Sequence, residues 1–207
     1  MILRMNNNEK HFMVEDDIQA RARARARTRR CKMKINIGCG MHKKKGFIRC
    51  DRDAIVNPDY CFDCERGPWP FKDDSCEEVL AENILEHLKN IDFFFEEAYR
   101  VLKKDGCLTI KVPHFMSMHA YSDPDHCRYF TPESFMYWDR TTTGSDGRPV
   151  KRCDADFIVV DLKMNIDPVV LETFPDATEN KAVNQHMWNI VQFITAELKP
   201  VKPMRNK

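Results

Sequence analysis

Three short apolar runs near the start of the chain each end in residues that can contact a nucleoside. Residues 34–37 (KINI) end at the turn 38–40 (GCG), where missing Cβ atoms let the backbone approach a ligand closely. The second run ends in Asp51, whose carboxylate can accept hydrogen bonds from both hydroxyls of a ribose. The third ends in Asp63, which suits an adenine amino group. Together they indicate a nucleoside-containing cofactor, either NAD or S-adenosylmethionine.

A later group of histidines supplies candidate bases. His114, His119 and His126 follow an apolar run at 107–112 and lie near two aspartates, Asp123 and Asp125. A histidine close to its ordinary pKa can take a proton from a hydroxyl or an amine. We expect His126 or His114 to do so. The alternative is that these side chains hold a loop in place through hydrogen bonds.

The cysteines and histidines do not match a metal-binding pattern. Cys61 and Cys64 form one Cys-x-x-Cys without a second pair, whereas structural zinc needs about four ligands. The histidine group has no closely spaced ligand pair. The nine cysteines are scattered and odd in number, which is a poor disulfide framework. We therefore expect no metal, and free thiols in a reducing compartment.

Alternating strands and helices must position these groups. Apolar residues at helical spacing predict a helix from Ile91 to Lys104, with Asp92 as its N-cap and residues 105–106 (DG) as its end. Further strands are predicted at 46–51, 59–63, 78–81, 107–112, 156–162 and 188–198, and a short helix is predicted to begin at 131–133 (TPE). This alternation predicts an α/β fold with a largely parallel sheet.

The charge is distributed unevenly along the 207 residues. Residues 1–34 hold ten Lys and Arg against four Asp and Glu, a net charge of +6, and the rest of the chain has a net charge of −5. Hydrophobic residues make up 43%, and no apolar run is long enough for a membrane span or a signal peptide. We expect one domain at 32–203, preceded by a flexible basic tail at 1–31.

Five segments, in this order and spacing, resemble the class I S-adenosylmethionine-dependent methyltransferases of the type 11 group. They are residues 35–40 (INIGCG), 46–51 (GFIRCD), 68–88 (PWPFKDDSCEEVLAENILEHL), 96–114 (EEAYRVLKKDGCLTIKVPH) and 123–135 (DPDHCRYFTPESF). The resemblance covers roughly half of the chain. It implies a Rossmann-like α/β fold, in which helices cover both faces of a seven-stranded, mostly parallel sheet and the cofactor lies at the carboxyl ends of the strands.

The resemblance also implies which residues contact S-adenosylmethionine: Gly38, Cys39, Gly40, Asp51, Asp63, Cys64, Glu82 and Asn83. The turn 38–40 would pass beneath the methionine part, and Asp51 would bind the ribose. Asp63 and Cys64 would frame the adenine, with Trp69 as a further contact on that side. Glu82 and Asn83 would face the transferring methyl group. His87, in a Leu-Glu-His that the family shares, is a third candidate base, and residues 114–150 would form a lid on the substrate side.

The chain departs from the family at several points. Asn36 stands where the family has an acid, and residues 41–45 are too short for the usual first helix. Some relatives that act on hydroxyl groups carry Glu-x-x-Glu-His where this chain has residues 83–87 (NILEH). Because Asn83 replaces the first carboxylate, Glu86 and His87 make a poor Mg²⁺ pair.

Three hypotheses about function follow. The first is a cytoplasmic enzyme, a monomer or weak dimer, that moves a methyl group from S-adenosylmethionine to an O or N acceptor in a small molecule, a sugar or a nucleic acid. The second is a non-catalytic module of the same fold that recruits nucleic acid or an acidic partner through the arginines at 21–30, which also resemble a nuclear-import signal. The third, an enzyme using NAD or a nucleotide sugar, is disfavoured by the absence of Gly-x-Gly-x-x-Gly.

Overall fold

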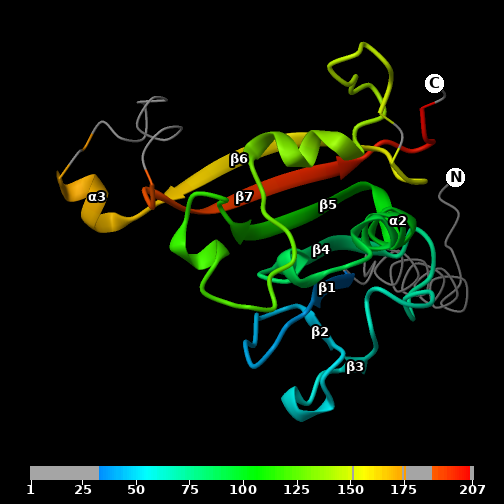
Figure 1. Ribbon diagram of the computed structural model, residues 1–207. Helices are drawn as coiled ribbons and strands as arrows, with labels where there is room; N and C mark the ends of the chain where they lie inside the picture. Colours follow the sequence, from blue (N-terminus) through cyan, green and yellow to red (C-terminus); the bar gives the residue numbers. More distant parts are fainter. Residues whose placement is uncertain (1–32, 151, 174, 176–187, 206–207) are drawn as a thin grey trace, which may run out of the picture. The chain divides into compact units, whose positions relative to one another are not determined.

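The fold is built around one seven-stranded sheet (Figure 1). A computed structural model describes residues 33–150, 152–173, 175 and 188–205. The expected tail at 1–31, with its arginines at 21–30, lies outside the described residues. No α-helix within the described ranges is both long and apolar enough to cross a membrane.

The strands lie in the order β3-β2-β1-β4-β5-β7-β6 (Figure 1). They are β1 (Met33–Ile37), β2 (Ile48–Asp51), β3 (Tyr60–Cys61), β4 (Cys76–Glu82), β5 (Leu102–Pro113), β6 (Phe157–Ile166) and β7 (Val191–Pro200). The first five are parallel, and β7 runs antiparallel to both β5 and β6. This confirms the predicted seven-stranded, mostly parallel sheet.

The register of the parallel strands brings their carboxyl ends together. Ile37 on β1 lies beside Cys50 on β2 and Ala81 on β4. The residues that follow each strand therefore emerge at one edge of the sheet. In parallel α/β sheets this edge is where ligands bind.

The hydrophobic core lies on one face of the sheet, under helix α2 (Ile91–Val101). Every second residue of the central strands is buried there, including Ile35, Val79 and Ile110. Phe95 of α2 stacks on Trp138 with ring centroids 3.6 Å apart, which fixes the 3-10 segment η4 (Pro132–Trp138) against α2. The other short helical segments are η1 (Ala54–Val56), η2 (Leu85–His87), η3 (Met118–Ala120) and α3 (Pro168–Thr173).

The predicted start of the long helix at Ile91 is confirmed, but its predicted N-cap and its predicted end were wrong. Asn90, not Asp92, is the N-cap, and the Asp92 carboxylate instead forms an ion pair with Arg152 at 2.8 Å. The helix ends at Val101, and residues 102–106 belong to β5. The backbone N–H groups of Asp74 and Ser75 donate to the last helical carbonyls, Arg100 O and Val101 O. Leu102 then pairs with β4, so the chain enters the sheet directly.

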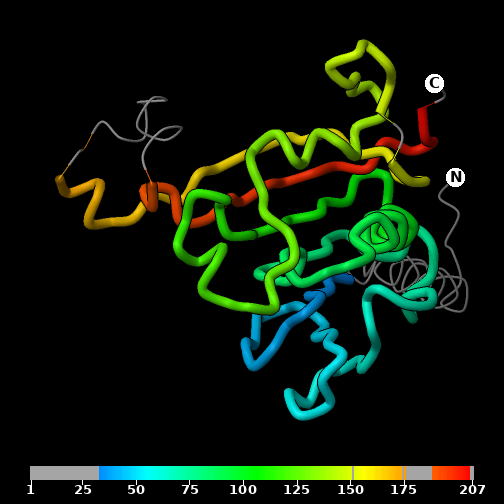
Figure 2. The backbone as a smooth tube through the Cα atoms, viewed as in Figure 1, coloured from blue at the N-terminus to red at the C-terminus, as the bar shows by residue number. Residues whose placement is uncertain are grey.

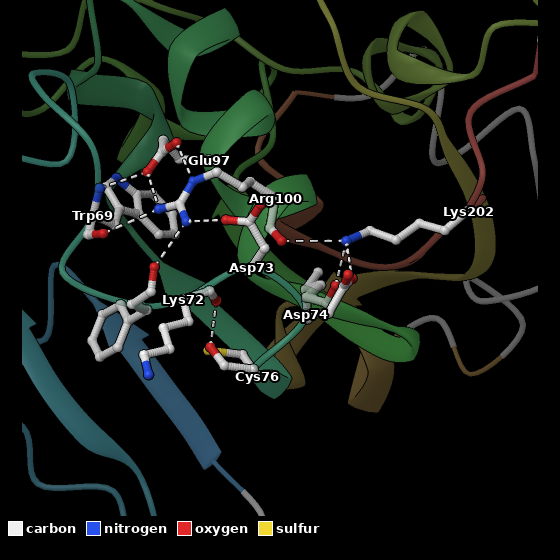
Figure 3. Close-up of polar contacts among 11 residues, drawn as sticks. Trp69, Lys72, Asp73, Asp74, Cys76, Glu97, Arg100 and Lys202 are labelled. Atoms are coloured by element: carbon white, nitrogen blue, oxygen red, sulfur yellow. Dashed lines mark hydrogen bonds and ion pairs between the residues drawn. The ribbon is translucent and has the colours of Figure 1, made fainter.

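A buried polar network ties α2 to the loop before β4 (Figure 3). Glu97 accepts a hydrogen bond from the backbone N–H of Trp69 at 2.5 Å and forms an ion pair with Arg100 at 2.7 Å. Arg100 also donates to the carbonyls of Trp69 and Phe71. The indole N–H of Trp69 donates to Cys64 O at 3.2 Å, so the network extends to the segment that follows β3.

This network should make a large contribution to stability. Glu97→Ala leaves the buried Trp69 N–H without its acceptor and removes a carboxylate that pairs with the half-buried Arg100 guanidinium. We expect the free energy of unfolding in urea to fall by about 3 kcal/mol. Glu96→Ala is the matched control, because the hydrogen bond that Glu96 accepts from Asp154 N is exposed, and its cost should stay below about 1 kcal/mol. Equal losses in the two variants would contradict this account.

Candidate active site

The turn after β1 approaches the chain beyond β4 so closely that it requires glycine. Gly38 has φ +67°, and a Cβ atom there would lie 2.9 Å from Ile84 Cβ. Rotation of the Ile84 side chain cannot relieve that contact, because a Cβ atom does not move with χ angles. Gly40 has φ +50° but open space around it, so it is constrained by its backbone angle alone.

The same turn is hydrogen-bonded to the end of β2. Asp51 accepts from Gly40 N at 2.8 Å through Oδ2 and from Asp53 N at 3.0 Å through Oδ1. Arg49 donates to Gly40 O at 2.9 Å and to Val56 O at 2.7 Å. The glycine turn is therefore held at both its N–H and its carbonyl. Sequence analysis missed Arg49, because no local motif marks a side chain that binds backbone carbonyls.

A cavity of about 280 Å³ opens beside this turn, at the carboxyl ends of β1, β2 and β4. Its lining includes six of the eight residues predicted to contact a cofactor, namely Gly38, Gly40, Asp51, Asp63, Cys64 and Asn83. The other two do not line it. The Cys39 side chain is buried, and Glu82 forms an ion pair with Lys44 at 3.1 Å.

The far wall of this cavity is shaped by the segment after β3. Phe62, Asp63 and Cys64 line it. Burial raises the pKa of the Cys64 thiol to about 12, so this cysteine is a neutral, apolar part of the wall. Trp69, expected to contact the cofactor, is buried instead and supports the wall from behind through its hydrogen bond to Cys64 O.

A second cavity of about 560 Å³ adjoins the first. Asn83 and His87 line both cavities, so they stand at the junction. The rest of the second lining comes from β4–η2, from the chain after β5 and from β7: Glu86, Pro113, His119, Ser122, Asp123, Pro124, His126 and Phe193. The structure thus brings His87, His119 and His126 around one space.

The chain after β5 returns to η2 to complete the second cavity. It runs out beyond the end of β5 and comes back toward β4 before it enters η4 (Figure 2). On the way, the N–H groups of Cys127 and Arg128 donate to Glu86 O at 2.9 and 3.2 Å. The rings of His87 and His126 consequently lie edge to face, with centroids 4.6 Å apart.

His114, the remaining candidate base, lies apart from both cavities. It is buried at the end of β5, its backbone N–H donates to Gln192 O, and it forms a bridge with Phe130. Burial lowers the pKa of its imidazole. The backbone N–H of Met116 donates to the imidazole Nδ1 at 3.4 Å, which matches the alternative of a histidine that holds the loop, and the catalytic role of His114 remains a prediction.

Comparison with known proteins identifies methyltransferases as the proteins that share this fold. Residues 14–110 match the model of a type 11 family described as a methyltransferase domain. A SAM-dependent methyltransferase from Archaeoglobus fulgidus superposes with a TM-score of 0.55 at 16% identity, covering 91% of this chain and 99% of that one. No curated protein is significantly similar in sequence.

Two further solved structures share the fold. A coclaurine N-methyltransferase bound to N-methylheliamine and S-adenosylhomocysteine has a TM-score of 0.51 at 12% identity, over 85% of this chain and 67% of that one. A Haemonchus contortus phosphoethanolamine N-methyltransferase in complex with phosphoethanolamine and S-adenosylhomocysteine has a TM-score of 0.50 at 15% identity, over 85% and 41%.

The sheet order and the cavity at its carboxyl edge define a class I methyltransferase fold. Within that class, residues 14–110 match the type 11 methyltransferase domain, and the chain is an S-adenosylmethionine-dependent methyltransferase. This finding agrees with the resemblance seen in the sequence.

The two glycines of the turn should respond differently to alanine. Gly38→Ala adds both backbone strain and a clash with Ile84, so we expect the free energy of unfolding to fall by about 3 kcal/mol. Gly40→Ala adds strain alone and should cost about 1 kcal/mol. Urea denaturation of the two variants measures the difference, and a smaller loss for Gly38→Ala would show that the close approach to Ile84 is not rigid.

His114 should make stability depend on pH. Burial lowers the pKa of its imidazole in the native state, whereas the unfolded chain takes up the proton near a pKa of about 6.5. The free energy of unfolding should therefore fall as the pH drops below about 6.5. In His114→Gln this decrease should be smaller, as measured by urea unfolding between about pH 7 and about pH 5. The control is His119→Gln, which alters an exposed histidine and should show the same decrease as the wild type. An unchanged decrease in His114→Gln would contradict the view that burial of His114 causes it.

Proposed function

We propose that this chain binds S-adenosylmethionine in the smaller cavity and transfers its methyl group to an O or N acceptor held in the larger one. The observation that carries the proposal is the junction of the two cavities at Asn83 and His87. A donor and an acceptor in adjoining spaces meet at that point. Methyl transfer needs this proximity and alignment above all, because the sulfonium already provides the leaving group.

The smaller cavity offers a suitable group for each part of the cofactor. The Asp51 carboxylate uses each oxygen for one backbone N–H, and its remaining lone pairs can accept from the ribose hydroxyls. Asp63 and Cys64, at the far wall, would lie beside the adenine. The glycine turn and Asn83 would then face the methionine end, which places the sulfonium near the junction.

The larger cavity supplies the acceptor side. As the acceptor heteroatom forms its bond to the methyl carbon, the carbon–sulfur bond breaks and its electron pair stays on sulfur, which leaves S-adenosylhomocysteine. The acceptor must also lose a proton. His126 and His87 are the candidate bases on this wall, and a neutral imidazole can take that proton.

The charge of the larger cavity favours a small-molecule acceptor. Among the described residues that line it are two acids, Glu86 and Asp123, and no Lys or Arg. A nucleic-acid backbone is normally held by Lys and Arg at its phosphates. A small-molecule acceptor therefore fits this cavity better than a nucleic acid does.

Cofactor binding tests the proposal directly. Calorimetric titration of S-adenosylmethionine should show micromolar binding to the wild-type chain. Asp51→Ala should weaken it at least tenfold, about 1.4 kcal/mol, because both the ribose acceptor and the brace on the turn are lost.

The matched control is Asp53→Ala, which removes the same side chain two residues away and outside the cavity. It should bind within about twofold of the wild type, and thermal unfolding should show that both variants remain folded. If a folded Asp51→Ala bound as tightly as the wild type, the site would be misplaced. If the wild type bound no cofactor, the non-catalytic module would be the better hypothesis.

A further inference from the structure

Three side chains in the larger cavity converge as metal ligands do. A carboxylate oxygen of Glu86 and one ring nitrogen from each of His87 and His126 all lie within 4.8 Å of one another. Ligands on one zinc-sized ion, bound at about 2.0–2.2 Å, lie about 3–4 Å apart. Small side-chain rotations would therefore bring the three atoms onto a common ion.

Glu86 is buried without a complete set of partners. Only 1% of the residue is exposed, and its Oε2 atom has no hydrogen-bond partner among the residues that the structure describes. A buried carboxylate oxygen without a donor is unfavourable and rare in proteins. Its position in the wall of a cavity, beside two imidazoles, calls for a positively charged ligand.

The contacts around His126 leave one ring nitrogen available to an ion. Its Nδ1 lies 3.0 Å from Ala120 O. Because a carbonyl can only accept, the neutral form of the imidazole carries its proton on Nδ1 and a lone pair on Nε2. Metal-binding histidines in proteins are usually oriented by such a bond from the other ring nitrogen to a backbone carbonyl or a carboxylate.

The backbone around the three residues is also held in place. Arg128 donates to Leu88 O and to Lys89 O, both at 2.6 Å, and its backbone N–H donates to Glu86 O. These bonds fasten the segment that carries His126 to the segment that carries Glu86 and His87. The cluster is therefore pre-organised rather than assembled from mobile loops.

We propose that Glu86, His87 and His126 bind a divalent first-row transition-metal ion, of the kind represented by Mn²⁺, Co²⁺ and Zn²⁺. Two imidazoles and one carboxylate favour these ions over Mg²⁺ and Ca²⁺, which prefer oxygen ligands. Three protein ligands leave coordination positions open, and all three residues line the larger cavity.

The metal site can exist whether or not the proposed function is correct. Its use in methyl transfer, however, rests on the proposed function. An ion in the cavity wall would bind the acceptor heteroatom and lower the pKa of its proton, which would pass to water in the cavity. His87 and His126 would then hold the ion and not the proton.

Metal titration of the full chain, after treatment with a chelator, tests the site. Calorimetry with Co²⁺ and Mn²⁺ should show one ion bound per chain at micromolar concentration. The visible spectrum of the Co²⁺ form should show nitrogen and oxygen ligands without a band from sulfur. Glu86→Gln and His126→Gln should each weaken binding at least tenfold.

Two controls separate this site from other ligands. His119→Gln removes a histidine of the same cavity outside the cluster, and Cys127→Ser removes the thiol next to His126. Both should bind within about twofold of the wild type. No binding by the wild type, unchanged binding in a folded Glu86→Gln, or a sulfur band lost in Cys127→Ser would each overturn the proposal.

Titration of S-adenosylmethionine into the same preparation distinguishes the two proposals. Cofactor binding without metal binding would overturn the metal site alone. Metal binding without cofactor binding would overturn the proposed function and leave the metal site standing.

Discussion

The hydrogen bond from Gly40 N to Asp51 Oδ2, 2.8 Å long, joins the two chain segments on which the site depends. It can form because β1 and β2 are parallel and in register, with Ile37 beside Cys50. The turn after β1 and the last side chain of β2 then meet at one edge of the sheet. Arg49 holds the other side of the turn, so the floor of the smaller cavity is fixed before any ligand binds.

The remaining walls are held by contacts from more distant parts of the chain. Glu97 and Arg100 of α2 hold Trp69, and Trp69 in turn holds the carbonyl of Cys64. The segment after β5 is fastened to η2 through Glu86 O. The sheet thus supplies the positions at which the strands end, and these polar contacts fix the loops that follow them.

Sequence reasoning worked where function follows from local pattern. Gly38, Asp51 and Asp63 each come after an apolar run, and parallel pairing alone brings such positions together. It was wrong where long-range contacts decide. The helical pattern continued to Lys104, but the carbonyls of Arg100 and Val101 bond to the chain before β4. Trp69 looked like a ligand contact because nothing in the sequence shows that Glu97 draws its backbone inward.

The proposed metal site shows the same limit most clearly. Glu86 and His87 are adjacent, but His126 is 39 residues beyond His87 and reaches them only because its segment returns to η2. Spacing rules look for ligands close together in sequence, so they did not group His126 with Glu86 and His87, and the sequence predicted no metal.

A crystal structure of the full chain with S-adenosylhomocysteine would test most directly whether donor and acceptor meet at the junction of the two cavities. The account predicts the ribose on Asp51, the adenine beside Asp63 and Cys64, and the sulfur at the junction formed by Asn83 and His87. A sulfur atom turned away from the larger cavity, or a ligand bound elsewhere on the chain, would contradict it.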